Sequence, residues 1–145
     1  MTGSTELARR AVACKHWRWM PGMLVMSTNN YHRPARIESL DGDCYGLTVI
    51  PGDGGPVLAS HHEWGVAGSF PRGCTIPDLA DPATLGCLLA LVREAWGDPE
   101  AHAMMCHDSA RVRITWLAWR GSEYRWIGEG KTEAEALVAA LEAAP

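Results

Sequence analysis

The residues best suited to chemistry gather in the N-terminal quarter of the chain, where arginine alternates with tryptophan. The stretch HWRWMPGM, residues 16–23, places Trp17, Arg18 and Trp19 in succession before a proline–glycine pair. Guanidinium groups bind carboxylates and phosphates, and indole rings stack on flat ligands. This segment therefore predicts one edge of a binding surface for an anionic ligand that also has an aromatic part.

Charge is unevenly distributed along the sequence and supports the same interpretation. The net charge is −4, yet the window between Glu6 and Glu38 holds six basic residues and no acid. Such a local excess of positive charge favours an anion-binding face, with clustering by chance as the alternative. The predicted ligand-binding residues are Trp17, Arg18, Trp19, Tyr31, His32, Arg33 and Arg36. Among them, the three arginines are the expected anion contacts, and Trp19 or Tyr31 is the expected stacking platform.

The overall composition suits one soluble domain over residues 1–145. Hydrophobic residues make up 47% of the chain, and seven tryptophans stand against one phenylalanine. The N-terminus lacks the apolar segment of a secretion signal, and the longest apolar run, near residues 85–92, is too short to cross a bilayer. Five cysteines are scattered without a C-x-x-C pair. We therefore expect a cytoplasmic protein with reduced thiols and no contact with membranes.

Motifs for metal binding or catalysis are weak. The potential metal ligands do not follow the spacing of a zinc site, and the histidine pair at residues 61–62 is not part of an H-E-x-x-H motif. The glycine-rich segment at residues 51–56 lacks the Gly-Lys-Ser/Thr ending of a phosphate loop, and no G-x-S-x-G elbow occurs. A cysteine nucleophile at Cys44 or Cys106 has no identifiable base. We expect no metal, no cofactor and no enzymatic activity.

Two helices are predicted from their end signals. Asp81 and Pro82 mark the beginning of a helix with leucines at helical spacing, and Gly97 marks its end. Thr132 and Glu135 form the capping box of the last helix. A shorter helix is expected from about residue 4 or 5 to residue 14, and residues 15–20 fit either its continuation or a strand.

Alternating patterns and turn signals predict the strands. They are expected at residues 45–50, 57–64, 101–106, 111–119 and 124–127, with residues 65–77 as a loop. The order of these elements predicts an α+β fold. In it, an antiparallel sheet of about four to five strands is flanked by helices, as a layered α/β/α sandwich.

Three segments together carry a family resemblance. They are ELARRAVACKHWRWMPGM near the N-terminus, PDLADPATLGCLLALVREAWGDP in the middle and GKTEAEALVAALEAAP at the C-terminus. This combination resembles small accessory proteins of tailed phages and prophages, in particular the phage ABA sandwich domain group. The likeness covers most of the chain and is weakest over residues 24–75. It implies a non-virion protein that acts in the cytoplasm of a bacterial host, often against host defence, and it transfers no catalytic residue.

Three functions are compatible with these features. The first is a counter-defence protein that sequesters a small anionic, nucleotide-derived immune signal, with the possibility of a homo-oligomer enclosing the ligand. The second is an inhibitor that binds a host defence protein directly, using Trp, Tyr and Arg as hot spots. The third is a nucleic-acid-binding accessory protein. The sequence alone favours the first.

Overall fold

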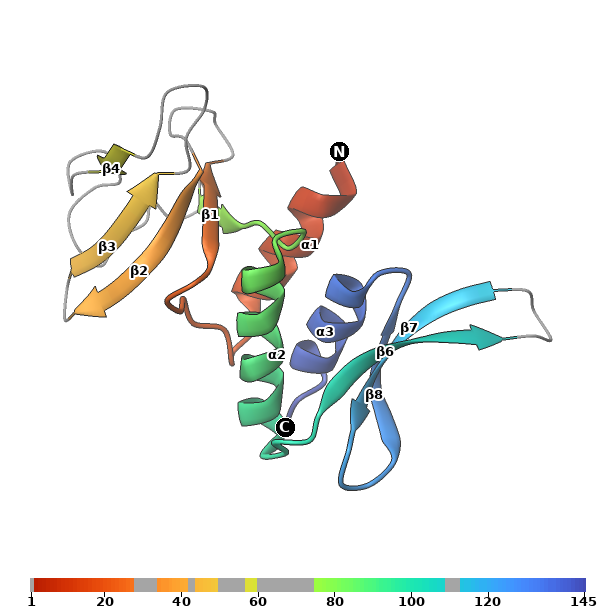
Figure 1. Cartoon of the computed structure of the whole chain (residues 1–145). Coiled ribbons are helices and arrows are strands. Elements are labelled where there is room, and N and C mark those ends of the chain that lie inside the picture. Colours follow the sequence, from red (N-terminus) through yellow and green to blue (C-terminus); the bar gives the residue numbers. More distant parts are fainter. Residues whose placement is uncertain (1, 28–33, 42–43, 50–56, 60–74, 109–112) are drawn as a thin grey trace. The chain divides into compact units, whose positions relative to one another are not determined.

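The computed structural model describes residues 2–27, 34–41, 44–49, 57–59, 75–108 and 113–145 (Figure 1). The chain divides into two compact units. Unit 1 contains Met1–Ala8 and Trp19–Thr84, and unit 2 contains Arg9–Arg18 and Leu85–Pro145. Helices α1 (Thr2–Ala13) and α2 (Pro82–Trp96) each have residues in both units.

In the described part of unit 1, the strands form one five-stranded sheet. Its strand order is β4-β3-β2-β1-β5, and every neighbouring pair is antiparallel. The strands are β1 (Leu24–Ser27), β2 (Ala35–Asp41), β3 (Cys44–Val49), β4 (Val57–Ala59) and β5 (Thr75–Pro77).

The turn that precedes β1 fixes the position of this sheet's inner strands. Gly22 has a φ of 97°, a conformation that suits glycine because it has no Cβ. Its N–H donates to the Ile37 carbonyl at 2.7 Å, and the Ile37 N–H donates to the Met23 carbonyl at 2.9 Å. Met23, Val25 and Ile37 are all buried. Residues 21–22 form the turn that a proline–glycine pair favours.

Unit 2 contains a three-stranded antiparallel meander and the helix that covers it. Strands β6 (His102–Asp108), β7 (Arg113–Arg120) and β8 (Arg125–Gly130) pair in the order β6-β7-β8. Helix α3 (Glu133–Glu142) packs along β8 and β7 (Figure 1). Its buried stripe includes Leu137, Val138 and Leu141.

Two glycines allow α3 to approach β8 closely. A Cβ at Gly128 would lie 2.6 Å from the Ala140 nitrogen, and one at Gly130 would lie 2.7 Å from the Ala136 nitrogen. Real Cβ atoms do not approach backbone so closely, so these positions require glycine for contact rather than for a turn. The face of the meander that carries Gly128 is therefore the face under α3.

Both predicted helix caps are confirmed. The Asp81 carboxylate accepts a hydrogen bond from the Thr84 N–H at 2.8 Å at the beginning of α2. Thr132 Oγ1 accepts from the Glu135 N–H at 3.2 Å, and Glu135 accepts from the Lys131 N–H at 2.6 Å. The reciprocal bond thus goes to the residue before the cap.

The α+β class and the antiparallel pairing are confirmed, and several details were wrong. The described strands form two sheets instead of one. Residues 75–77, predicted as loop, form β5 because their backbone pairs with β1. Residues 17–20 form neither helix nor strand, and α1 begins at Thr2, earlier than expected.

Candidate functional site

Arg18, the first predicted anion contact, lies in an exposed ion pair of unit 2. Its two terminal nitrogens donate to the two carboxylate oxygens of Glu94 at 2.7 and 2.6 Å. Half of the Arg18 side chain and 61% of the Glu94 side chain remain exposed. The hydrogen bond raises the pKa of Arg18 and lowers that of Glu94. Exposed pairs contribute little to stability, so an incoming anion can compete with Glu94.

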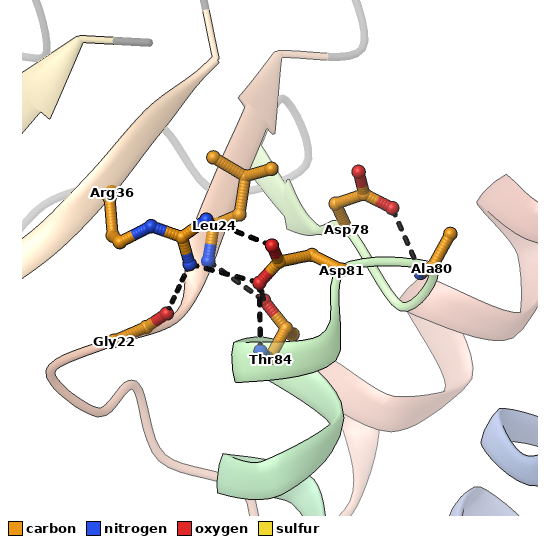
Figure 2. A network of polar contacts seen from close by, with 7 residues as sticks. All are labelled: Gly22, Leu24, Arg36, Asp78, Ala80, Asp81 and Thr84. Carbon is orange, nitrogen blue, oxygen red and sulfur yellow. Dashed lines mark hydrogen bonds and ion pairs between the residues drawn. The ribbon is translucent and has the colours of Figure 1, made fainter.

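Arg36, another predicted anion contact, is engaged within unit 1 (Figure 2). Its guanidinium donates to both Asp81 oxygens at 2.9 and 2.8 Å and to the Gly22 carbonyl at 2.7 Å. Asp81 also accepts from the Thr84 hydroxyl at 2.9 Å, and that hydroxyl accepts from the Leu24 N–H at 2.8 Å. This network joins β2, β1, the preceding turn and the beginning of α2. The geometry favours a structural role for Arg36.

The electrostatics of the Arg36 network agree with that role. The Arg36 guanidinium lowers the pKa of Asp81 to about 2, and the two hydrogen bonds from Thr84 act in the same direction. Thr84 is completely buried, and 12% of the Asp81 side chain is exposed. A ligand anion would have to displace a fixed carboxylate to reach Arg36.

The remaining predicted residues are only partly described. Trp17 and Trp19 are both half-buried, and the backbone N–H of Trp17 donates to the Cys14 carbonyl at 3.0 Å. Tyr31, His32 and Arg33 lie outside the described residues. Trp17 and Arg18 belong to unit 2, whereas Trp19 and Arg36 belong to unit 1. The assignment of these seven residues to one ligand site stays a prediction.

A second surface, which was not among the sites expected from the sequence, lies on the β7–β8 hairpin of unit 2. Tyr124 is 89% exposed and Trp126 is 60% exposed, and Arg125 between them is exposed as well. Tyr124 has a φ of 49°, a left-handed conformation that non-glycine residues rarely adopt. The Trp126 ring packs edge-on against the Trp119 ring at a centroid distance of 6.0 Å.

Trp96, at the end of α2, forms the base of this surface. Its indole N–H donates to the Ala140 carbonyl at 2.8 Å, which fixes the ring against α3. The guanidinium carbons of Arg120 and Arg125 lie 5.6 and 5.8 Å from the ring centre, within cation–π range. A hollow of about 370 Å³ lies here, lined by Trp96, Arg125, Trp126, Ile127, Gly128, Glu129 and Ala143.

A buried carboxylate holds the hairpin in place. Asp98 is 2% exposed and accepts hydrogen bonds from the Ser122 hydroxyl at 2.7 Å and the Glu100 N–H at 2.9 Å. The Ser122 hydrogen bond is the main cause of the lowered pKa of Asp98. Arg120 Nε lies 3.6 Å from the same carboxylate, and its Nη1 lies 3.2 Å from Glu123. These contacts tie the connection between β7 and β8 to the residues that follow α2.

We define the hairpin surface as Trp96, Tyr124, Arg125 and Trp126. Arg125 makes no ion pair with any described residue, in contrast to Arg18 and Arg36. The sequence did indicate this surface, because YRW at residues 124–126 repeats the aromatic–arginine–aromatic order of WRW at residues 17–19. The sequence pattern instead predicted residues 124–127 as a strand in a sheet flanked by helices. Residues 125–127 do lie in β8, but the exposure of Trp126 shows that its side chain is not covered by a helix.

The described residues contain no metal-ligand cluster, and the thiol of Cys14 has a raised pKa. No group of three or more His, Cys, Asp or Glu side chains within these ranges could hold a metal ion. The Cys14 thiol donates to the Arg10 carbonyl at 3.3 Å, and burial, together with nearby Glu142, raises its pKa. Cys14 is therefore a poor nucleophile at neutral pH.

Comparison with known proteins gives no family for this chain. No family model, no curated protein and no solved structure matches it. The resemblance to the phage ABA sandwich group thus stays a hypothesis. In the part of the chain that the structure describes, no helix is long and apolar enough to cross a membrane.

Proposed function

We propose that this chain is a non-enzymatic binding protein that recognises a protein partner through the hairpin surface. The observation that carries the proposal is Tyr124, an almost fully exposed aromatic side chain held in a strained conformation beside Arg125 and Trp126. Strained residues persist where the surrounding structure fixes them, often at binding sites. Tyr, Trp and Arg are also the residues that dominate binding energy at protein interfaces.

The charges around the hollow favour a protein over a polyanionic ligand. Arg125 is the cation that lines it, and Glu129 lines it too. Arg120 is already engaged by Asp98 and Glu123. A ligand with several phosphates would meet one available cation and a carboxylate, whereas a partner with an apolar side chain and one acidic residue would find both complements. This supports the interpretation as a direct protein antagonist.

Sequestration of a nucleotide-derived signal remains the second candidate. It is favoured by one observation, the exposed Arg18–Glu94 pair beside half-buried Trp17, from which an anion could displace Glu94. Arg36 supports this candidate less, because Asp81 and Gly22 occupy its guanidinium. The predicted nucleic-acid role has no specific support among the described residues.

The biological setting is part of the same proposal. The resemblance noted in the sequence implies a phage-encoded protein that acts against host defence in the bacterial cytoplasm. A three-layer sandwich of helices around a sheet belongs to that expectation as well. Both the inhibitor and the sequestration hypotheses fit such a role, because each requires stoichiometric binding without turnover.

The test compares two variants with wild type in one capture experiment. Tagged wild-type chain, a Tyr124→Ser/Trp126→Ala variant and an Arg18→Ala variant are incubated with bacterial lysate, and bound proteins are quantified by mass spectrometry. A captured protein is then purified and titrated against each variant by calorimetry. We expect wild type to form a stoichiometric complex with the captured protein. The hairpin variant should bind that protein at least tenfold more weakly, and the Arg18→Ala variant should bind it as tightly as wild type does. Equal affinity for the hairpin variant and wild type would refute the hairpin assignment.

The second candidate is tested on the same preparations. Each folded variant is heated after exposure to lysate, and the released small molecules are identified by mass spectrometry. A near-stoichiometric phosphate-bearing compound, released from wild type but absent from the Arg18→Ala variant, would favour sequestration. Release of no such compound, together with a hairpin-dependent protein complex, would favour the antagonist.

A further inference from the structure

The described sheet edges differ in how they are protected against pairing with another chain. An edge strand exposes unpaired backbone groups, which natural proteins protect by short length, proline, charge or bulges. In unit 1, the outer strands β4 and β5 have three residues each, and β5 ends at Pro77. In unit 2, the outer strand β8 carries Arg125 and Glu129, and its register with β7 shifts. These three edges are protected.

Strand β6, the fourth edge, has the weakest protection. It is seven residues long, pairs with β7 alone among the described strands, and contains no Lys, Arg, Glu or Pro; its one acidic residue stands at its last position, 108. Met104 is 44% exposed and Met105 is 58% exposed. Methionine is enriched at protein interfaces and adapts its shape to a facing surface. The edge thus combines apolar side chains with a row of backbone groups that no described strand pairs.

We propose that β6 pairs antiparallel with β6 of a second copy, which joins two three-stranded meanders into one continuous sheet. A second copy fits because a two-fold axis pairs the same strand with itself and closes the assembly. Hydrogen-bonded and non-hydrogen-bonded pairs alternate along an antiparallel ladder. Two pairs related by a two-fold axis must be of the same type, so neighbouring pairs cannot be related in this way. The axis therefore passes midway between one residue and its own copy. This inference does not depend on the proposed function.

In one register, every residue of β6 has a partner in the second copy. The centre of His102–Asp108 is Met105, so pairing of Met105 with its copy engages all seven residues of β6. Because opposed residues share a face, Met104 then lies beside Cys106 of the second copy. The same register places position 102, a histidine, opposite position 108, an aspartate, at both ends of the interface. Each end of the interface therefore pairs a histidine position with an aspartate position.

A dimer of this kind would present two hairpin surfaces. Strand β6 and the hairpin lie on opposite edges of the same meander, so pairing through β6 leaves the edge at β8 available. Two linked sites bind a multimeric partner more tightly than one site does, without any new contact.

The first experiment measures the mass of the full chain by light scattering over a concentration series. We expect twice the mass of the single chain for wild type and the single-chain mass for Met105→Lys, because two lysines would meet at the axis. Tyr124→Lys is the matched control, since it adds the same charge at an exposed position of unit 2 outside β6. It should remain dimeric. A monomeric wild type, or a Met105→Lys variant as dimeric as the control, would overturn the proposal.

A crosslink tests the register and does not depend on how well the lysine variant folds. In a Cys106→Ser background, Met105→Cys should form a disulfide-linked dimer on mild oxidation. Opposed residues in an antiparallel pair lie about 4.5–5.5 Å apart between Cα atoms, within disulfide range. Tyr124→Cys in the same background is the control. Crosslinking of Met105→Cys several-fold faster than of the control supports the axis at Met105, and equal rates contradict it.

Discussion

Arg36 and Asp81 face each other through two parallel hydrogen bonds, and this pair ties β2 to the beginning of α2 (Figure 2). The same carboxylate caps the helix through the Thr84 N–H. Asp81 thus serves as the N-cap that the sequence predicted and as the partner of an arginine for which the sequence had suggested a different role. One side chain secures both a helix end and a strand.

Because of the Arg36–Asp81 pair, the free energy of unfolding should fall as the pH is lowered. The pKa of Asp81 is about 2 in the folded chain against 3.8 ordinarily. A lowered pKa contributes stability that is fully present above the ordinary value and is lost as pH falls through the folded value. We expect a loss on the order of 1–2 kcal/mol between about pH 4 and pH 2, measured by denaturant titration.

The control for this pH dependence is Asp81→Asn, which keeps a capping side chain but removes the charge. It should lose about 1–2 kcal/mol at neutral pH, because a partly buried guanidinium loses its counter-charge. Its stability should then vary less than that of wild type between pH 4 and pH 2. A variant with the acid dependence of wild type would show that other carboxylates cause it.

Two glycine-to-alanine substitutions should have opposite effects. Gly86 lies within α2, and a Cβ added there would meet no atom within 4 Å, so Gly86→Ala should stabilise by about 0.5–1 kcal/mol. Gly128 lies against Ala140 of α3, so Gly128→Ala should destabilise by about 1–3 kcal/mol or more as α3 is pushed away. Thermal unfolding of both variants checks this. A neutral Gly128→Ala would mean that α3 packs less closely on β8.

The local features of this fold were predictable, and the reason is physical. A helix cap depends on residues three or four positions apart, so Asp81 and Thr132 identified their helices directly. Hairpins with short connections followed from turn residues in the same way. The pairing of β1 with β5 joins segments about 50 residues apart, as in Val25 opposite Pro77, and no local pattern specifies it.

The candidate site shows the same limit. Residue types at residues 16–36 suggested anion binding, but type does not reveal whether a charge is already neutralised inside the protein. Arg36 is neutralised by Asp81, which lies 45 positions away in the sequence. Conversely, the pattern predicted that Trp126 lies in a strand, but not which face of the sheet α3 covers. Helix α3 covers the face that carries Gly128, and Trp126 is exposed.

The buried leucines of α2 should be sensitive to truncation according to depth. Leu88 is completely buried, whereas the neighbouring Leu89 is only half-buried. We expect Leu88→Ala to cost about 2–5 kcal/mol of unfolding free energy and Leu89→Ala clearly less. Chemical denaturation with one protocol for both variants gives the comparison. Equal losses would contradict the orientation of α2.

Tyr124 should show a conflict between stability and binding. Its left-handed backbone conformation costs a non-glycine residue on the order of 1 kcal/mol, and its side chain is almost fully exposed. Tyr124→Gly removes the unfavourable backbone contact and loses few packing interactions. It should therefore unfold at the same temperature as wild type or a few degrees higher, while its affinity for a partner bound at the hairpin falls.

Tyr124→Ala separates the two effects. Alanine loses the aromatic ring but keeps the Cβ that disfavours a φ of 49°. It should bind as weakly as the glycine variant and be less stable than that variant. If the glycine variant instead unfolded at a lower temperature than the alanine variant, a Cβ would not be unfavourable at a φ of 49°. Tyr124 would then hold no backbone strain, and the case for a binding role that rests on this strain would be lost.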